Sequence, residues 1–455
     1  MRIAIIFSTF LLFTSALYAE SNNKIEQLIQ KKLPQATVAV LVKDLKSNEV
    51  VYSRNAEKLL APASSMKLLT AAAALYQLSP GYKFETRLMS KGDDVYIVFN
   101  GSPSLTSNDL TLLLAKLPKN IKGDLIVDVS HFKPPYYPSG TSFDDLGWYY
   151  AAPDTAAILD ENAVAFKFIS AKELGKPVQI KSQSPNNPIH IINEVRSVSA
   201  QTEKNHCNMN IDVLTGNTLK LYGCLTQYKD PLLMKLAIPE PVGRAKELIR
   251  DYLKQKHIIL KGHIITGKVP ADAKTISRLE SPGLTQLVTH MLLESDNLYA
   301  NSLTKELGYR VTGEGSYKQG VFAIKQILSK NTQVDVNKIS VYDGVGTRYN
   351  LVTAEQMVNL LTDLYQNEEL RSILLNALPQ SGSTGSLKAR MNKTVLNQLV
   401  YAKTGTLHDV SSLSGFLIRP GKNPLAFSII INGVDKPIAV AKALEEEILL
   451  AVYGE

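Results

Sequence analysis

The 455-residue chain has only two cysteines, Cys207 and Cys224, and seven histidines. A few thiol and imidazole ligands without a recognisable spacing do not make a zinc site, so we expect neither a metal nor a cofactor. In an exported chain, two cysteines favour one disulfide, and Cys207 and Cys224 are the candidate pair.

Other features that the sequence lacks exclude further classes of protein. No G-x-S-x-G motif is present, and no histidine has the context of a base beside a nucleophile, which argues against a histidine-dependent serine hydrolase. The formal charge of +8 arises from 50 basic and 42 acidic residues without a run of like charge. This mild bias suits an anionic cell-wall polymer or an ordinary solvated surface, and it is not the footprint of a nucleic-acid binder.

Long apolar runs are also rare, and the one at the N-terminus is short. Arg2, the run Ile3–Leu12 and small residues near Ala19 predict a signal peptide over residues 1–19. The run is too short for a stable membrane anchor, and no cysteine near the cleavage site offers a lipid anchor. We therefore expect an exported protein without a transmembrane anchor.

The chain is too long for a single hydrophobic core. The distribution of strand and helix patterns along it predicts one domain that is interrupted by an insertion. Strand and helix patterns at both ends, 20–83 and 282–455, indicate one α+β domain. The region 84–281 has many short strands punctuated by Pro, Gly and Asn, which predicts a mostly β insertion, plausibly of two parts. The helices expected are 23–32, 243–256, 284–293, 298–307, 317–328, 353–365 and 437–452. At the two ends the strands expected are 36–45, 49–52, 400–403, 414–418 and 425–431.

The stretch Leu60–Leu75 carries a serine and a lysine three residues apart, Ser64 and Lys67, where Pro62 opens a nearly all-apolar helix. Residues at this spacing share one helical face, and the first turn favours a developing negative charge. A buried lysine is costly unless it is paired or neutral with a lowered pKa. Such an amine beside a hydroxyl can create a serine nucleophile without histidine.

The same spacing recurs elsewhere, so this motif alone is a moderate signal. Ser64 is the only one of these serines that opens a helix expected to be buried. The other pairs are Ser21–Lys24, Ser130–Lys133 and Ser302–Lys305.

Two later motifs complete a pattern. Ser295-Asp296-Asn297 is predicted to lie in a turn after helix 284–293, and Lys403-Thr404-Gly405-Thr406 is predicted to end strand 400–403. The order SxxK, SxN and KTG, each in its own structural context, is the signature of penicillin-binding proteins and serine β-lactamases.

From Leu60 to Leu75 and from Leu284 to the C-terminus, the chain resembles the low-molecular-mass class C penicillin-binding proteins (the penicillin-binding protein 4 type, peptidase family S13), which are D-alanyl-D-alanine carboxypeptidases and endopeptidases. The long gap between Lys67 and Ser295 matches the large insertion of that family. Four further stretches resemble it: Asp144–Pro153, Tyr342–Leu351, Gly385–Lys388 and Lys403–Gly415. The resemblance implies a β-lactamase/transpeptidase-like α+β domain, with an antiparallel sheet flanked by helices and a mostly β insertion after the SxxK helix.

The resemblance also implies roles for the motif residues. Ser64 attacks the carbonyl of the penultimate D-alanine, Lys67 is the general base, and the backbone N–H groups of Ser64 and Thr406 form the oxyanion hole. Ser295 relays a proton to the leaving D-alanine, with Lys403 beside it. Asn297 binds the peptide amide, and Thr404, Gly405 and Thr406 line the substrate strand.

In this family a pocket recognises the side chain of the stem-peptide diamino acid. The matching positions are Asp145, Tyr150, Arg348 and His408. Here Val345 replaces the usual serine of the Asp-Gly-Ser-Gly stretch, the loop before Arg348 is one residue shorter, and His408 replaces a neutral polar residue.

The expected function is therefore a periplasmic serine D-Ala-D-Ala carboxypeptidase that cleaves peptidoglycan stem peptides and is acylated by β-lactams. Endopeptidase action on cross-links remains open, because it uses the same steps. The alternatives are a serine β-lactamase and a catalytically silent peptidoglycan-binding protein.

Overall fold

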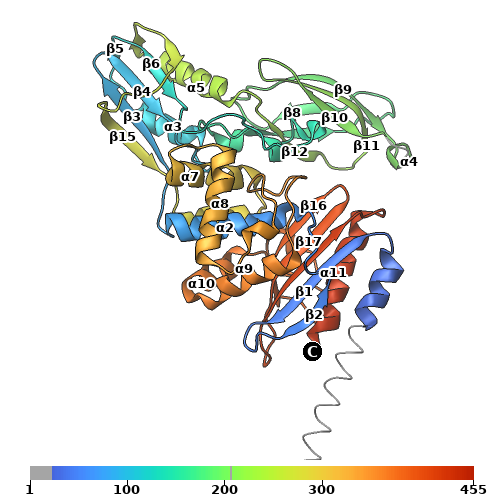
Figure 1. Cartoon of the computed structure of the whole chain (residues 1–455). Coiled ribbons are helices and arrows are strands. Elements are labelled where there is room, and N and C mark those ends of the chain that lie inside the picture. The colour runs from blue at the N-terminus through green and yellow to red at the C-terminus, as the bar shows by residue number, and fades with distance from the viewer. Residues whose placement is uncertain (1–22, 205–206, 455) are drawn as a thin grey trace, which may run out of the picture. The chain divides into compact units, whose positions relative to one another are not determined.

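The computed structural model describes residues 23–204 and 207–454, which form two compact units (Figure 1). Unit 1 contains the described residues up to Pro80, Leu284–Asp296 and the residues from Val321 onward. Unit 2 contains Gly81–Gly283 and Asn297–Gly320. The predicted signal peptide, 1–19, lies outside the described residues.

A five-stranded antiparallel sheet forms the centre of unit 1, in the order β16-β17-β18-β1-β2. Strand β1 pairs with β18 from Thr37 opposite Asn432 to Asp44 opposite Leu425, so the two ends of the chain build one sheet. The strands are β1 (Thr37–Asp44), β2 (Val50–Arg54), β16 (Val400–Leu407), β17 (Val410–Leu417) and β18 (Leu425–Asn432).

Helices cover both faces of this sheet, because alternate residues of a strand point to opposite sides. The helix of residues 23–32 and α11 bury Ile29, Leu444 and Ile448 in one core with alternate residues of β1 and β18. On the other face α9 contacts β1, β17 and β18, and α10 packs against both α9 and α6. Helix bounds are α2 (Lys67–Leu78), α6 (Leu284–Leu293), α9 (Ala354–Gln366), α10 (Glu368–Ala377) and α11 (Ile438–Tyr453).

Unit 2 is mostly β, with two large apolar cores and a smaller cluster around Met89 and Tyr96. In the first, the sheet β14-β6-β4-β3-β15 packs against α3 and α5. In the second, the sheets β10-β11-β9 and β12-β7-β8 share one apolar cluster. The first core contains β3 (Glu85–Lys91), β4 (Asp94–Val98), α3 (Ser107–Leu114), β6 (Leu125–Asp128), α5 (Pro241–Gln255), β14 (Ile264–Thr266) and β15 (Lys274–Glu280), with the short parallel pair β5 (Asn120–Ile121) and β13 (Ile259–Leu260). The second contains β7 (Ala163–Ile169), β8 (Gln179–Ser182), β9 (His190–Val198), β10 (Met209–Val213), β11 (Thr218–Thr226) and β12 (Leu232–Ala237).

The remaining elements are helical. They are α4 (Ala200–Lys204), α7 (Asn297–Thr312), α8 (Tyr317–Asn331) and the 3-10 turns η1 (Ala63–Met66), η2 (Phe143–Asp145), η3 (Tyr149–Ala151), η4 (Asp160–Asn162), η5 (Val336–Lys338) and η6 (Gly385–Leu387). Among the helices within 23–204 and 207–454, none is both long and apolar enough to cross a bilayer.

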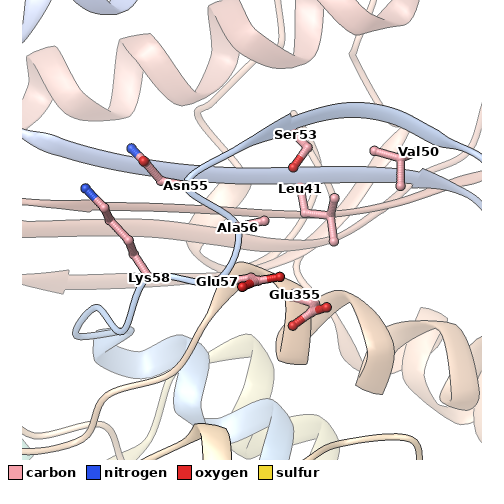
Figure 2. A pocket seen from close by; sticks show the side chains of 8 residues that line it. All are labelled: Leu41, Val50, Ser53, Asn55, Ala56, Glu57, Lys58 and Glu355. Atoms are coloured by element: carbon pink, nitrogen blue, oxygen red, sulfur yellow. The ribbon is translucent and has the colours of Figure 1, made fainter.

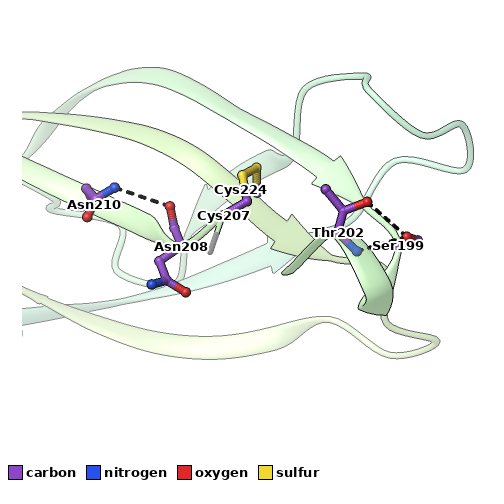
Figure 3. The surroundings of a disulfide bond; sticks show 6 residues. All are labelled: Ser199, Thr202, Cys207, Asn208, Asn210 and Cys224. Atoms are coloured by element: carbon purple, nitrogen blue, oxygen red, sulfur yellow. Dashed lines mark hydrogen bonds between the residues drawn. A yellow bond between two sulfur atoms is a disulfide. The ribbon is translucent and has the colours of Figure 1, made fainter. Parts of the chain in front are cut away.

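A disulfide joins Cys207 to Cys224 in the second core of unit 2 (Figure 3). Cys207 precedes β10 and Cys224 lies in β11, with their Cα atoms 5.5 Å apart, which is an ordinary disulfide separation. Both sulfurs are thereby occupied, and neither cysteine is available as a metal ligand.

Several expectations from the sequence need correction. Ser64 does not open an α-helix: it lies in the 3-10 turn η1, and α2 begins only at Lys67. The KTG motif does not end a strand, because β16 continues through it to Leu407. Helices α3 and α4 were missed in the inserted region, where α5 was the one helix expected, since their eight and five residues are too few for a clear helical period.

Candidate active site

Ser64 and Lys67 meet across the junction between η1 and α2. Lys67 Nζ lies 2.8 Å from Ser64 Oγ and donates a second, longer bond of 3.4 Å to the Val345 carbonyl. The Lys67 side chain is fully buried, whereas Ser64 is half-buried and open to a substrate. Burial lowers the pKa of Lys67 to about 7, although the charges of Asp296 and Asp343 oppose that shift. Near neutral pH a large fraction of the amine is therefore unprotonated and able to accept the serine proton.

The loop that supplies the Val345 carbonyl is built around a buried carboxylate, Asp343. Its Oδ1 accepts hydrogen bonds from the backbone N–H groups of Val345, Gly346 and Thr347, and its Oδ2 accepts from the side chains of Thr347 and Asn350. Asn350 Oδ1 in turn accepts from the backbone of residues 342 and 343. The sequence marked this stretch by resemblance, but it did not reveal this arrangement, because hydrogen bonds within a loop leave no periodic pattern.

A second lysine–serine pair joins the other two motifs. Lys403 Nζ donates to Ser295 Oγ at 2.8 Å and to the Thr404 carbonyl at 2.9 Å. Burial, and then the charge of Lys67, lower the pKa of Lys403 well below its usual value. Ser295 has a left-handed backbone with φ of 58°, which is a costly conformation for a serine and is held by the surrounding turn.

Close backbone approach explains two glycines of the site. A Cβ at Gly405 would overlap Ser412 Oγ and the Pro62 carbonyl, so only glycine lets β16 lie against η1. A Cβ at Gly346 would overlap the Ala63 carbonyl. The glycine of KTG is therefore required by the packing of the strand against the Ser64 turn.

Two further serines, which the sequence did not single out, hold the Ser64 turn in place. Ser65 Oγ lies 2.8 Å from Ser412 Oγ and bonds to the Lys403 carbonyl, while Ser412 Oγ donates to the Pro62 carbonyl at 2.6 Å. All of these groups are buried. The turn is thus fixed from its far side by polar contacts with β16 and β17.

The remaining predicted site residues lie in both units. Thr404 donates to Ser386 Oγ at 2.7 Å, and Thr406 is exposed near the end of β16. Arg348 lies exposed in the Asp343 loop, and His408 is exposed in the turn between β16 and β17.

Unit 2 brings three of the predicted residues together. Asn297, the first residue of α7, donates from Nδ2 to the Tyr150 carbonyl at 2.7 Å. The Tyr150 hydroxyl donates to Asp145 Oδ1 at 3.1 Å. The Tyr150 ring is parallel to that of Trp148, and burial raises its pKa.

A hollow beside β1 and β2 is separate from the predicted site residues. It has a volume of about 530 Å³ and is lined by Leu41, Val50, Ser53 and Glu355, among others (Figure 2). None of the predicted site residues lines it.

With this geometry in place, comparison with known proteins identifies the family. The D-Ala-D-Ala carboxypeptidase 3 (S13) family matches residues 21–449. D-alanyl-D-alanine carboxypeptidase DacB of Haemophilus influenzae is 29% identical, over 91% of this chain and 89% of that protein. The crystal structure of penicillin binding protein 4 (dacB) from Haemophilus influenzae superposes with a TM-score of 0.85 at 27% identity, covering 94% of this chain and 99% of that one. A second structure, of that protein complexed with a β-lactam, superposes with a TM-score of 0.80 at 26% identity, covering the same shares of both chains.

The fold and the match define a serine-type D,D-peptidase of the hydrolase class. The chain belongs to the D-Ala-D-Ala carboxypeptidase 3 (S13) family. The predictions of this family, this activity and a β-lactamase/transpeptidase-like fold with a large insertion are confirmed.

Proposed function

We propose that this enzyme cleaves the terminal D-alanine from peptidoglycan stem peptides in the periplasm through an acyl-enzyme on Ser64. The observation that carries this proposal is the 2.8 Å contact between Ser64 Oγ and the fully buried Lys67 amine. A disulfide and the signal-like residues 1–19 support an oxidising compartment.

In the acylation step, the neutral Lys67 amine takes the proton from Ser64 Oγ as that oxygen attacks the carbonyl carbon of the penultimate D-alanine. The backbone N–H groups of Ser64 and Thr406 stabilise the negative charge on the carbonyl oxygen. The C–N bond then breaks, and the nitrogen of the leaving D-alanine receives the proton through Ser295, which Lys403 holds. Water attacks the resulting ester, and the second product leaves with Ser64 restored.

We assign the orientation of the substrate to polar residues from several distant parts of the sequence. Asn297 binds the amide of the acyl donor, and Thr404, Gly405 and Thr406 offer the edge of β16, the first strand of its sheet, to the peptide backbone. Asp145, Tyr150, Arg348 and His408 contribute to selecting the stem-peptide side chain.

β-Lactams mimic the scissile bond, so we propose that they acylate Ser64 as well. The complex of the Haemophilus influenzae relative with a β-lactam supports this proposal.

The test is the intact mass of the mature protein after benzylpenicillin, followed by D-alanine release from a stem pentapeptide. Wild-type protein is expected to carry a lasting penicilloyl adduct and to release D-alanine, whereas Ser64→Ala does neither. Ser302→Ala is the matched control, because Ser302 has the same spacing to a buried lysine, Lys305, and should behave like wild type. A short-lived adduct with rapid penicillin hydrolysis would instead make the protein a β-lactamase, and no adduct would leave a silent binding protein.

A further inference from the structure

A polar hollow of about 400 Å³ opens in unit 2, entirely within that unit. Its walls carry charged side chains from strand β3, from helix α7 and from the loops beside them. The lining residues include the charged Lys83, Arg87 and Arg310 and the polar Asn100 and Tyr309. The groups involved are separate from the serines and lysines described above.

One wall of this hollow contains a carboxylate, Glu306, that already accepts several hydrogen bonds from its neighbours. Glu306 is almost fully buried and accepts hydrogen bonds from the Tyr82 hydroxyl at 2.7 Å, Arg310 Nε at 2.6 Å and His131 Nε2 at 2.7 Å. These donors lower the pKa of Glu306 despite its burial. Glu306 is thus ionised, and its charge is already compensated by its own neighbours.

The other cations of the hollow, except one, also have acidic partners. Lys83 pairs with Glu280 at 2.9 Å, and Arg310 pairs with Glu306 at 2.6 Å. Arg87 differs from them. Within the described residues no hydrogen bond or ion pair reaches its side chain, and its Nε is buried without a partner.

The position of Arg87 makes this lack of a partner costly. In the antiparallel pair β15–β3, Arg87 lies directly opposite Arg278. Like charges facing each other across two strands are destabilising. Arg278 pairs with Glu85 and Glu280, whereas Arg87 has no such partner among the described residues. An anion bound at Arg87 would compensate its charge and give the guanidinium the bidentate partner that its donors fit.

We propose that this hollow binds a carboxylate of an uncross-linked peptidoglycan stem peptide, with Arg87 as its main contact. The choice of this ligand rests on the proposed function, which brings the enzyme to such peptides. The carboxylates of Glu85 and Glu306 already pair with Arg278 and Arg310, which leaves Arg87 to balance a singly charged carboxylate and not a doubly charged phosphate. The Asn100 amide can donate beside Arg87, and the half-exposed Tyr309 ring offers an apolar surface to the rest of the ligand. Unit 2 would thus hold the polymer independently of Ser64.

The experiment uses the full mature protein acylated by benzylpenicillin, so that the site at Ser64 is closed. Calorimetry then measures binding of a disaccharide-tetrapeptide muropeptide, of the same compound with its carboxylates amidated, and of inorganic phosphate. Arg87→Gln should weaken muropeptide binding about tenfold or more, as expected for the loss of a charge-assisted hydrogen bond. Arg87→Lys should keep part of the affinity, and amidation should weaken binding to wild type to the same degree as Arg87→Gln.

Lys274→Gln is the matched control. Lys274 is an exposed lysine in the same strand pair, it does not line the hollow, and its loss removes the same charge. The affinity of the Lys274→Gln variant for the muropeptide should stay within about twofold of wild type, because exposed charges contribute little. Melting curves of all variants show whether each one folds.

Equal binding by wild type and Arg87→Gln, no binding by wild type, or preference for phosphate would each overturn the inference. The proposed function is judged separately, by the penicilloyl mass. If Ser64 is not acylated, the comparison of wild type with Arg87→Gln on the open protein still decides whether the hollow binds the muropeptide.

Discussion

Two serine–lysine pairs with the same SxxK spacing lie in buried helical segments, one in each unit. Ser64 and Lys67 belong to unit 1, and Ser302 and Lys305 belong to α7 in unit 2. Both lysines are fully buried. Lys67 lies 2.8 Å from its serine, whereas Lys305 turns to the carboxylate of Asp154 at 3.2 Å and to the carbonyls of residues 133 and 135.

The difference shows how the surroundings of a buried lysine set its pKa. Lys305 has a carboxylate in contact and the rings of Tyr136 and Tyr317 around its ammonium group, so its charge is compensated. Burial lowers the pKa of Lys305, but Asp154 opposes that shift by direct contact. For Lys67 the charges of Asp296 and Asp343 oppose the desolvation, and its pKa still falls to about 7.

The largest effect is expected from replacing the lysine of the first pair. Lys67→Met should slow acylation by benzylpenicillin by about 10² to 10⁴-fold, the usual range for loss of a general base. The free energy of unfolding should change by only about 1 kcal/mol, because a desolvated amine is replaced by an apolar chain. Time-resolved intact mass and urea unfolding measure the two quantities. Acylation at the wild-type rate would assign the base to another group.

Replacing the lysine of the second pair should lower the stability strongly and leave the acylation rate nearly unchanged. Lys305→Met leaves Asp154 buried without its cation, which should lower the free energy of unfolding by about 3–5 kcal/mol. The acylation rate of the folded fraction should stay near that of wild type. Adding Asp154→Asn should recover part of the lost stability, since both charges are then gone. If Lys305→Met is as stable as wild type, the ion pair between Lys305 and Asp154 does not contribute to the stability of the protein.

The pH dependence of acylation sharpens the same contrast. Only the neutral form of Lys67 accepts a proton, so the second-order rate constant with benzylpenicillin should be flat above its pKa of about 7. Below that pH it should fall about tenfold per unit, because the neutral fraction falls in that proportion. Stopped-flow acylation between pH 5 and 9 gives the profile. A rate that keeps rising up to pH 9 would mean that burial does not depress the pKa of Lys67.

The smallest effect is expected at Ser302. Its Oγ is buried, and within the described residues it has no hydrogen-bond partner. Ser302→Ala should therefore leave the free energy of unfolding unchanged or raise it by up to about 1 kcal/mol, since an unsatisfied hydroxyl is removed. Urea unfolding tests this. A clear loss of stability, or slower acylation, would show that the second pair has a role of its own.

Much of the fold could be predicted, because it depends on regular patterns. The helix from Leu284 and the strand from Leu425 begin where their apolar residues place them. Strand β17 was predicted to begin only at Ser414, although it begins at Val410, because Ser411 and Ser412 look like a turn. Those serines are buried by contacts to Glu445, Ser65 and Pro62, which come from distant parts of the chain.

The sequence by itself predicted the chemistry of the site: which serine and which lysines would carry it, and which two cysteines would form the disulfide. It predicted this because motif spacing and order are local properties of the chain. Only the tertiary structure decided which of two buried SxxK pairs has the lysine facing its serine, and why Gly405 must be a glycine. Burial, contact and field depend on residues far apart in sequence, such as Asp343 beside Lys67 and Asp154 beside Lys305, and no local pattern encodes them.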